Sequence, residues 1–285
     1  MAEIKEVGIL GSGIMGAGLA EVAARSGHDV VLRSRTLEGA EAAFTKLQKS
    51  FERQVSKERM TQEEADEVLS RVRVTDHLGQ LANCDLVIES VVEDLDVKKF
   101  LFAELEQIVK PSGILATNTS TLPIVDMAMS TQRPDKVCGI HFFNPAPMMR
   151  LVEVIQPVVT SDETIASVMT FVESCNKDAV MVEDRAGFVV NALLFPYLNN
   201  AVRMWEYGTA SMESIDIAMK GGCNMPMGPF ELLDLVGLDT SVSILDALYY
   251  EFRDPNYAPM PTLRRKVAAG QLGRKTGHGF YQYNR

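Results

Sequence analysis

Four polar side chains in this 285-residue chain are of types that move a proton and polarise an oxygen atom. His141 ends an apolar run and is, of four histidines, the one at the expected carboxyl end of a strand. Glu153 lies on the next predicted strand, where a carboxylate can hydrogen-bond the imidazole and fix its tautomer. Ser120 follows another predicted strand, and Asn191 belongs to a later helix. Hydride transfer to or from a carbon that bears oxygen requires a base for the hydroxyl proton, a carboxylate that orients this base, and hydrogen-bond donors to the substrate oxygen.

A glycine-rich turn near the N-terminus predicts a dinucleotide site. The turn consists of Gly11, Ser12, Gly13, Ile14, Met15 and Gly16. Gly11 permits a tight turn, Gly13 lets the backbone approach a pyrophosphate, and Gly16 lets the following helix pack close to the strand. A pyrophosphate would bind the N–H groups at the N-terminus of that helix. A strand before the turn, a helix after it and a second strand beyond are the context that the motif requires.

The end of the second strand distinguishes between the two nicotinamide cofactors. Folds that bind NAD carry an Asp or Glu there for the ribose hydroxyls, whereas an Arg nearby accommodates the 2′-phosphate of NADP. This chain has Ser34 at that place, between Arg33 and Arg35, with Thr36 next. A hydroxyl and a guanidinium can hold a phosphate through charge-assisted hydrogen bonds. The alternative is that these arginines are solvated surface charges. We favour NADP(H) over NAD(H).

Strand patterns alternate with helical patterns through the first two-thirds of the chain. This order predicts an α/β fold of the Rossmann type, with a mostly parallel sheet covered by helices on both faces. The predicted strands are Val7–Leu10, Asp29–Arg33, Arg71–Thr75, Asp85–Ser90, Gly113–Thr117, Lys136–His141, Leu151–Ile155 and Ala179–Val182. Helical patterns cover Leu37–Arg71, Asp94–Lys110 and Asp162–Cys175, and a capping box at Thr61–Glu64 opens a separate helix within the first of these.

Helical patterns alone follow residue 183, which predicts a second, all-helical C-terminal domain. We place a dinucleotide-binding domain at residues 1–183 and a helical substrate and dimerisation domain at 184–285. The predicted helices of the second domain are Phe188–Tyr207, Ser211–Lys220, Phe230–Val236 and Leu238–Phe252. So short a unit with so many apolar residues would gain by burying them against a second copy, so we expect a homodimer. The alternative is a monomer whose first domain covers these helices.

Composition excludes several classes of function. With 46% hydrophobic and 23% charged residues the chain has the composition of a soluble globular protein. A net charge of −10 and the absence of a basic stripe make nucleic acid an unlikely partner. No apolar stretch approaches the roughly 18 residues that cross a membrane, and the N-terminus has no signal-peptide pattern. Four widely spaced cysteines indicate reduced thiols in the cytoplasm, and no spacing suggests a metal site.

Seven stretches of the sequence together resemble the L-3-hydroxyacyl-CoA dehydrogenase family, and more closely its short bacterial 3-hydroxybutyryl-CoA dehydrogenases. The resemblance covers nearly the whole chain. The stretches are Gly8–Gly16, Glu89–Glu93, Asn118–Ser120, His141–Pro145, Leu151–Val154, Asp184–Asn191 and Pro226–Asp234.

The resemblance implies a role for each candidate residue. It implies that His141 is the general acid/base with Glu153 as its partner, and that Ser120 and Asn191 contact the β-oxygen of the substrate. For the cofactor it implies contacts from Asn118, from Glu93 and Lys98 on the nicotinamide side, and from Lys275 in the C-terminal tail. Ser50 and Lys57 fall where the family holds coenzyme A.

The chain departs from the family pattern at two positions. Ser34 stands where the family normally has Asp, which supports NADP over NAD, and Ala192 replaces an Arg after Asn191.

The resulting expectation is a cytoplasmic oxidoreductase that interconverts (S)-3-hydroxyacyl-CoA and 3-oxoacyl-CoA, with 3-hydroxybutyryl-CoA and acetoacetyl-CoA favoured, as in fatty acid metabolism. Two alternatives stay open. One is the same fold acting on a hydroxy acid or sugar acid without coenzyme A, and the other is a non-catalytic, crystallin-like dinucleotide-binding protein.

Overall fold

The chain folds into two compact units. A computed structural model describes residues 3–283, and its contacts divide the chain between Arg185 and Ala186. The sequence placed this boundary two residues earlier, and the outer ends of the predicted domains, residues 1 and 285, lie outside the described residues.

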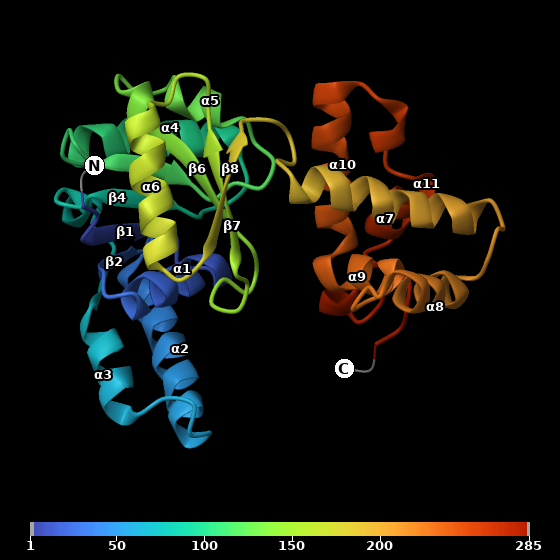
Figure 1. The fold of residues 1–285 in the computed structure, drawn as a ribbon, viewed down its shortest axis with the longest axis horizontal. Helices are drawn as coiled ribbons and strands as arrows, with labels where there is room; N and C mark the ends of the chain where they lie inside the picture. The colour runs from blue at the N-terminus through green and yellow to red at the C-terminus, as the bar shows by residue number, and fades with distance from the viewer. Residues whose placement is uncertain (1–2, 284–285) are drawn as a thin grey trace. The chain divides into compact units, whose positions relative to one another are not determined.

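The first unit is built on an eight-stranded sheet with the strand order β3-β2-β1-β4-β5-β6-β7-β8 (Figure 1). The strands are β1 (Glu6–Leu10), β2 (Asp29–Arg33), β3 (Val72–Thr75), β4 (Leu86–Glu89), β5 (Ile114–Thr117), β6 (Val137–Phe142), β7 (Leu151–Gln156) and β8 (Asp178–Glu183). Every residue of β4, β5 and β6 is buried, which is typical of parallel strands covered on both faces. The sheet, together with the helical second unit, confirms the predicted fold class.

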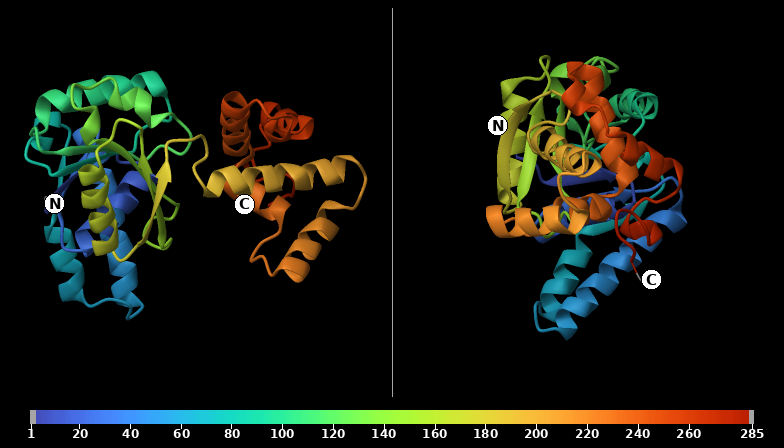
Figure 2. Two further views of the ribbon diagram at one scale, coloured as in Figure 1. Left: turned by 45° about the horizontal axis from the view of Figure 1, so that its top comes forward. Right: turned by 90° about the vertical axis from the view of Figure 1, so that its right-hand side faces the viewer.

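From residue 3 onward this unit has six helices, which cover both faces of the sheet (Figure 2). They are α1 (Ile14–Arg25), α2 (Leu37–Ser56), α3 (Gln62–Ser70), α4 (Leu95–Ile108), α5 (Ile124–Ala128) and α6 (Asp162–Ser174), with short 3₁₀ segments at Leu78–Leu81 and Pro134–Lys136. Side chains of α1, α2, α3 and α6 share one core with alternate strand residues, whereas α4 and α5 pack on the opposite face. The α2–α3 pair extends beyond the sheet in both views.

The strand β7 runs antiparallel to β6, although the other strand pairs are parallel. The connection between them, residues 143–150, is too short for the crossover of a dozen or more residues that a parallel neighbour requires. The resulting register places His141 directly opposite Glu153. The outermost strand, β8, is largely exposed.

The second unit is helical and has its own hydrophobic core. Its helices are α7 (Val190–Glu206), α8 (Met212–Cys223), α9 (Pro229–Val236), α10 (Leu238–Phe252) and α11 (Pro261–Ala268), with 3₁₀ segments at Pro255–Tyr257 and Arg274–Thr276. Trp205, Phe230 and Phe280 pack edge to face, with ring centroids 4.8–6.2 Å apart. The buried carboxylate of Asp234 accepts hydrogen bonds from the backbone N–H groups of Phe280 and Tyr281, which fixes the C-terminal segment.

The structure contains two helices that the sequence analysis did not predict. Helix α5 has five residues, which is too short for a 3.6-residue periodicity to be visible. Helix α11 begins with Pro261 at its first position, a recognised start signal that the analysis did not use. The predicted capping box at Thr61 is confirmed, because its hydroxyl and the Glu64 carboxylate each bond the other residue's backbone N–H.

No helix in residues 3–283 is both long and apolar enough to cross a membrane. Within the same residues, no group of three or more His, Cys, Asp or Glu side chains could hold a metal ion.

Candidate active site

The pairing of β6 with β7 brings His141 and Glu153 together. Residues directly opposite each other in an antiparallel pair have their side chains on the same face of the sheet, about 4.5–5.5 Å apart at Cβ. A hydrogen bond of 2.7 Å joins Nδ1 of His141 to Oε2 of Glu153. The two side chains are buried, at 4% and 1% exposure. The bond predicted between these residues is therefore present, and it holds the imidazole in one orientation, with the Phe143 ring 4.5 Å away.

The loop after β5 holds Ser120 in a defined position. The backbone N–H of Ser120 donates to Oε1 of Glu93 at 2.9 Å, and the Thr119 hydroxyl donates to the same oxygen at 2.5 Å. The side chain of Asn118 accepts a hydrogen bond from the backbone N–H of Phe142 at 2.9 Å. The Asn118 oxygen thus fastens the end of β5 to the strand end that carries His141.

A cavity of about 510 Å³ lies at the carboxyl ends of β1, β2 and β4, where open α/β sheets bind ligands. It is lined by Gly11, Ser12, Gly13, Arg33, Ser34, Arg35, Ser90, Val91, Val92, Val97 and Leu101. The predicted glycine-rich turn therefore forms one wall, and the end of β2 forms another. Residues 90–92 and the exposed face of α4 supply apolar walls that the sequence analysis did not assign.

The residues of this cavity fit a dinucleotide. The turn is tight because Gly11 has a φ of +126°. A Cβ on Gly13 would meet no atom within 4 Å, so the chain is open to a ligand there, whereas one on Gly16 would lie 1.9 Å from the carbonyl oxygen of Gly11. No side chain caps the N-terminus of α1. An uncapped helix end beside open space is suited to a pyrophosphate. Ile14 is exposed at this end and Met15 half-buried.

The end of β2 contributes two guanidinium groups and one hydroxyl to the cavity lining. The Ser34 hydroxyl accepts a hydrogen bond from the Ser12 hydroxyl at 2.8 Å. Arg33 donates from Nε to the carbonyl oxygen of Asp76, and partial burial lowers the pKa of its guanidinium. Arg35 is exposed. Thr36, which was also predicted to bind the cofactor, does not line the cavity. Its hydroxyl caps α2 by accepting a hydrogen bond from the N–H of Gly39.

Lys98 does not lie on the surface of the cavity. Its side chain is 1% exposed, and its ammonium nitrogen lies 2.7 and 2.8 Å from the two carboxylate oxygens of Glu89. A third carboxylate oxygen, Oε2 of Glu93, is 3.4 Å away. Glu89 lies in one of the stretches that resemble the family, but no role was predicted for it. A usable signal was present, since Lys98 shares its helix face with the core residues Phe102 and Leu105, where a lysine needs a buried partner.

The two residues proposed for coenzyme A lie on the helical pair that extends from the sheet. Ser50 is half-buried near the end of α2, and Lys57 is the exposed residue that ends this helix.

Two predicted residues belong to the second unit. Asn191 is the second residue of α7 and is 7% exposed. Lys275 forms an ion pair with Asp239, with Nζ 2.6 Å from Oδ1. Burial acts to raise the pKa of Asp239, but the hydrogen bond and charge of Lys275, together with backbone hydrogen bonds from Thr240 and Asp239, outweigh burial and lower it.

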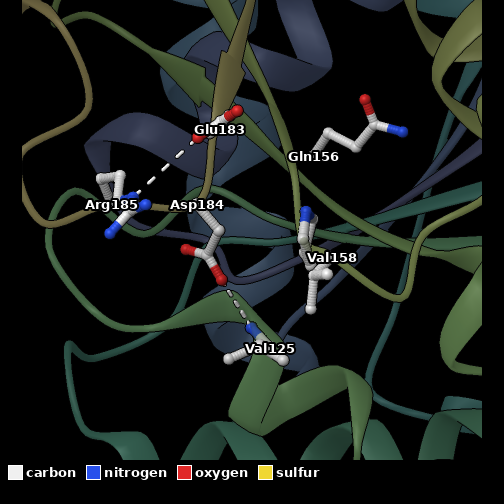
Figure 3. A pocket seen from close by; sticks show the side chains of 7 residues that line it. Val125, Gln156, Val158, Glu183, Asp184 and Arg185 are labelled. Atoms are coloured by element: carbon white, nitrogen blue, oxygen red, sulfur yellow. Dashed lines mark hydrogen bonds and ion pairs between the residues drawn. The ribbon is translucent and has the colours of Figure 1, made fainter.

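A second cavity, of about 410 Å³, lies at the ends of β7 and β8 (Figure 3). It is lined by Val125, Gln156, Pro157, Val158, Glu183, Asp184 and Arg185. The Asp184 carboxylate accepts from the backbone N–H groups of Ile124 and Val125, at 3.2 and 2.7 Å. Asp184 thus fastens the end of the first unit to the start of α5. None of these described residues belongs to the predicted site.

Comparison with known proteins gives two family matches that together span most of the chain. Residues 6–185 match the 3-hydroxyacyl-CoA dehydrogenase NAD binding domain, and residues 187–283 match the C-terminal domain of the same enzymes. The first match indicates a nicotinamide dinucleotide as the cofactor class.

Individual relatives match over the full length. A 3-hydroxybutyryl-CoA dehydrogenase of Mycobacterium tuberculosis is 46% identical, over 98% of this chain and 99% of that protein. One from Clostridioides difficile is also 46% identical, over 98% of this chain and 100% of that protein. The crystal structure of (S)-3-hydroxybutyryl-CoA dehydrogenase from Ralstonia eutropha is 40% identical and superposes with a TM-score of 0.97, covering 99% of this chain and 100% of that one. The chain belongs to the 3-hydroxyacyl-CoA dehydrogenase family.

Proposed function

We propose that this protein interconverts (S)-3-hydroxyacyl-CoA and 3-oxoacyl-CoA with NADP(H), and that its preferred pair is 3-hydroxybutyryl-CoA and acetoacetyl-CoA. The observation that carries the proposal is the buried hydrogen bond of 2.7 Å between His141 and Glu153. It belongs to a chain whose relatives are named for this reaction.

His141 acts as the general acid/base. Because Nδ1 is held by Glu153, Nε2 is the ring nitrogen that we assign to proton exchange with the substrate oxygen. In oxidation His141 takes the hydroxyl proton, and in reduction it returns a proton to the oxygen. Glu153 stabilises the imidazolium that forms in between, because a buried carboxylate favours the charged ring.

The chemistry that a bound nicotinamide supplies is transfer of a hydride to or from C3 of the substrate. Ser120 and Asn191 donate hydrogen bonds to the substrate oxygen and polarise it. We assign Glu93, which holds the Ser120 loop, to the nicotinamide side of the cofactor, and Asn118 to cofactor binding. We also assign Lys275 to cofactor binding.

The cofactor choice rests on the residues at the end of β2. Ser34, Arg33 and Arg35 line the cavity and offer a hydroxyl and two guanidinium groups to a 2′-phosphate. An acid at the place of Ser34 would repel that phosphate. We therefore propose NADP(H) as the preferred cofactor, and reduction as the physiological direction because an NADPH pool usually drives reduction.

Substrate, assembly and compartment complete the proposal. Coenzyme A is held by Ser50 and Lys57 on the extended α2, where an exposed ammonium can pair with phosphate. The second unit forms a homodimer, which would cover large apolar side chains that it exposes. The four cysteines are free thiols, in keeping with a reducing cytoplasm.

Initial rates on acetoacetyl-CoA, measured with NADPH and with NADH in turn, test the proposal. We expect turnover with both cofactors and a higher kcat/KM with NADPH. A parallel assay uses free 3-hydroxy acids without coenzyme A. Turnover of the free acids and none of the thioester would favour the first alternative, and cofactor binding without any turnover would favour a non-catalytic protein.

A further inference from the structure

A buried ion pair lies between the dinucleotide cavity and the Ser120 loop. Glu89 ends β4 with 0% exposure, and both of its carboxylate oxygens bind the ammonium of Lys98. The buried hydroxyl of Thr117, at the end of the neighbouring strand β5, donates to Oε2 of Glu89 at 2.7 Å. Each charge here has a partner, which offsets the several kcal/mol that burying an ion costs.

The ion pair is connected to the cavity wall on one side. The backbone N–H of Val91 donates to Oε1 of Glu89 at 2.6 Å. Val91 lines the cavity together with Ser90 and Val92. Loss of the Glu89 carboxylate would therefore release the segment that faces the dinucleotide.

The ion pair is connected to the Ser120 loop on the other side. Nζ of Lys98 lies 3.4 Å from Oε2 of Glu93. The other oxygen of Glu93 accepts from the N–H of Ser120 and from the hydroxyl of Thr119. Glu93 is 41% exposed at its side chain, and its carboxylate is oriented by this cation, by these two donors and by the Thr121 hydroxyl, which donates to the same oxygen at 3.5 Å.

Stability alone does not account for the pair. Replacing a buried ion pair by apolar residues of similar volume is often neutral or stabilising, whereas removing one partner is strongly destabilising. An apolar pair could fill the same space, but it could not hold Val91 and attract Glu93. We propose that Glu89 and Lys98 are positioning residues, which fix the 90–93 segment and through Glu93 the Ser120 loop. Lys98 thus acts on the cofactor through Glu93. This inference rests on the proposed function.

The test compares Glu89→Leu with the double variant Glu89→Leu/Lys98→Met in the full-length protein, because a glutamine oxygen would still accept from the N–H of Val91. Three quantities are measured: the Tm, the Kd for NADPH by fluorescence titration, and kcat and KM for acetoacetyl-CoA. The single variant leaves a buried ammonium without its main partner, so we expect its Tm to fall clearly. The double variant buries no unpaired charge, so we expect its Tm to recover to near that of the wild type.

The kcat and the NADPH affinity of the double variant distinguish a positioning role of Glu89 and Lys98 from a purely structural one. In the double variant we expect kcat to stay about tenfold below that of the wild type and NADPH to bind about tenfold more weakly, the size of one charge-assisted hydrogen bond. Wild-type kcat and wild-type NADPH affinity in a folded double variant would overturn the inference.

Two further outcomes keep the test decisive. If the double variant does not fold, Glu89→Asp replaces it, because the shorter side chain keeps both charges but withdraws its carboxylate from Val91 and Thr117. We expect a severalfold loss of kcat or NADPH affinity there, and unchanged values would overturn the inference. If the wild type does not reduce acetoacetyl-CoA, the proposed function fails, and the NADPH affinities of the variants then decide the inference alone.

Discussion

At the scale of single residues, the buried His141–Glu153 pair gives the sharpest prediction. His141→Gln keeps a polar side chain of similar size but cannot exchange a proton. We expect kcat for acetoacetyl-CoA to fall by at least about 10²–10⁴-fold, the range of general acid–base catalysis, while NADPH binding is retained. Steady-state kinetics and a fluorescence titration of the same preparation check both parts.

The matched control is Glu153→Gln. Its amide oxygen can still accept from Nδ1–H, but it stabilises the imidazolium less, so we expect a smaller loss of kcat than in His141→Gln. Near-normal turnover of the His141 variant would remove this mechanism.

Ser34 gives a second prediction at the residue scale. In Ser34→Asp a carboxylate enters the cavity wall between two arginines and repels a 2′-phosphate. We expect kcat/KM with NADPH to fall by about 100-fold or more, while kcat/KM with NADH holds or rises. Ser34→Ala is the control, because it removes the hydroxyl without adding charge. A Ser34→Asp enzyme that still preferred NADPH would show that the phosphate is bound elsewhere.

At the scale of elements, two glycines of the turn between β1 and α1 are predicted to differ in role, one affecting stability and the other cofactor binding. A Cβ at position 16 would lie 1.9 Å from the carbonyl oxygen of Gly11, whereas one at position 13 meets nothing within 4 Å. We expect Gly13→Ala to keep the wild-type Tm but to weaken NADPH binding by about tenfold or more, because the methyl group occupies the pyrophosphate approach.

Gly16→Ala is the counterpart, and we expect it to lower the Tm, because the turn and the helix must move apart. Calorimetry and NADPH titration of both variants distinguish the two effects. Equal NADPH affinity of Gly13→Ala and the wild type would place the pyrophosphate away from this turn.

At the scale of the whole molecule, the exposed apolar side chains of the helical unit lead us to expect a homodimer. Leu193, Tyr207, Ile217 and Tyr250 are each at least 67% exposed within this unit. We expect light scattering to give twice the 31.4 kDa mass of one chain. A charge on an apolar contact is costly, so we expect Ile217→Glu or Tyr250→Glu to shift the protein toward a monomer. Val158→Glu, at a 92% exposed position of the first unit, is the control. A monomeric wild type would contradict the dimer.

Some features of the molecule follow from residues that are close together in the chain. The glycine turn, the capping box at Thr61 and the helix α10 were predicted with their bounds or nearly so, because steric freedom, local hydrogen bonds and hydrophobic periodicity act over a few residues. The alternation of strand and helix indicated the parallel sheet for the same reason. The residue types and the family motifs likewise predicted His141 and Glu153 as catalytic residues, and the end of β2 was predicted as the place that selects the cofactor; these roles stay predictions.

Other features depend on contacts between distant segments, and only the tertiary structure determined them. The antiparallel register of β6 and β7 placed Glu153 opposite His141, and a shift by one residue would have turned that carboxylate to the other face. Burial of Lys98 against Glu89 depends on how α4 packs over the end of β4, which neither segment specifies alone. The sequence by itself therefore determined which residue types are available and in which elements they lie. Packing between elements decided which of their charges meet in the low-dielectric interior, where electrostatic interactions are strongest.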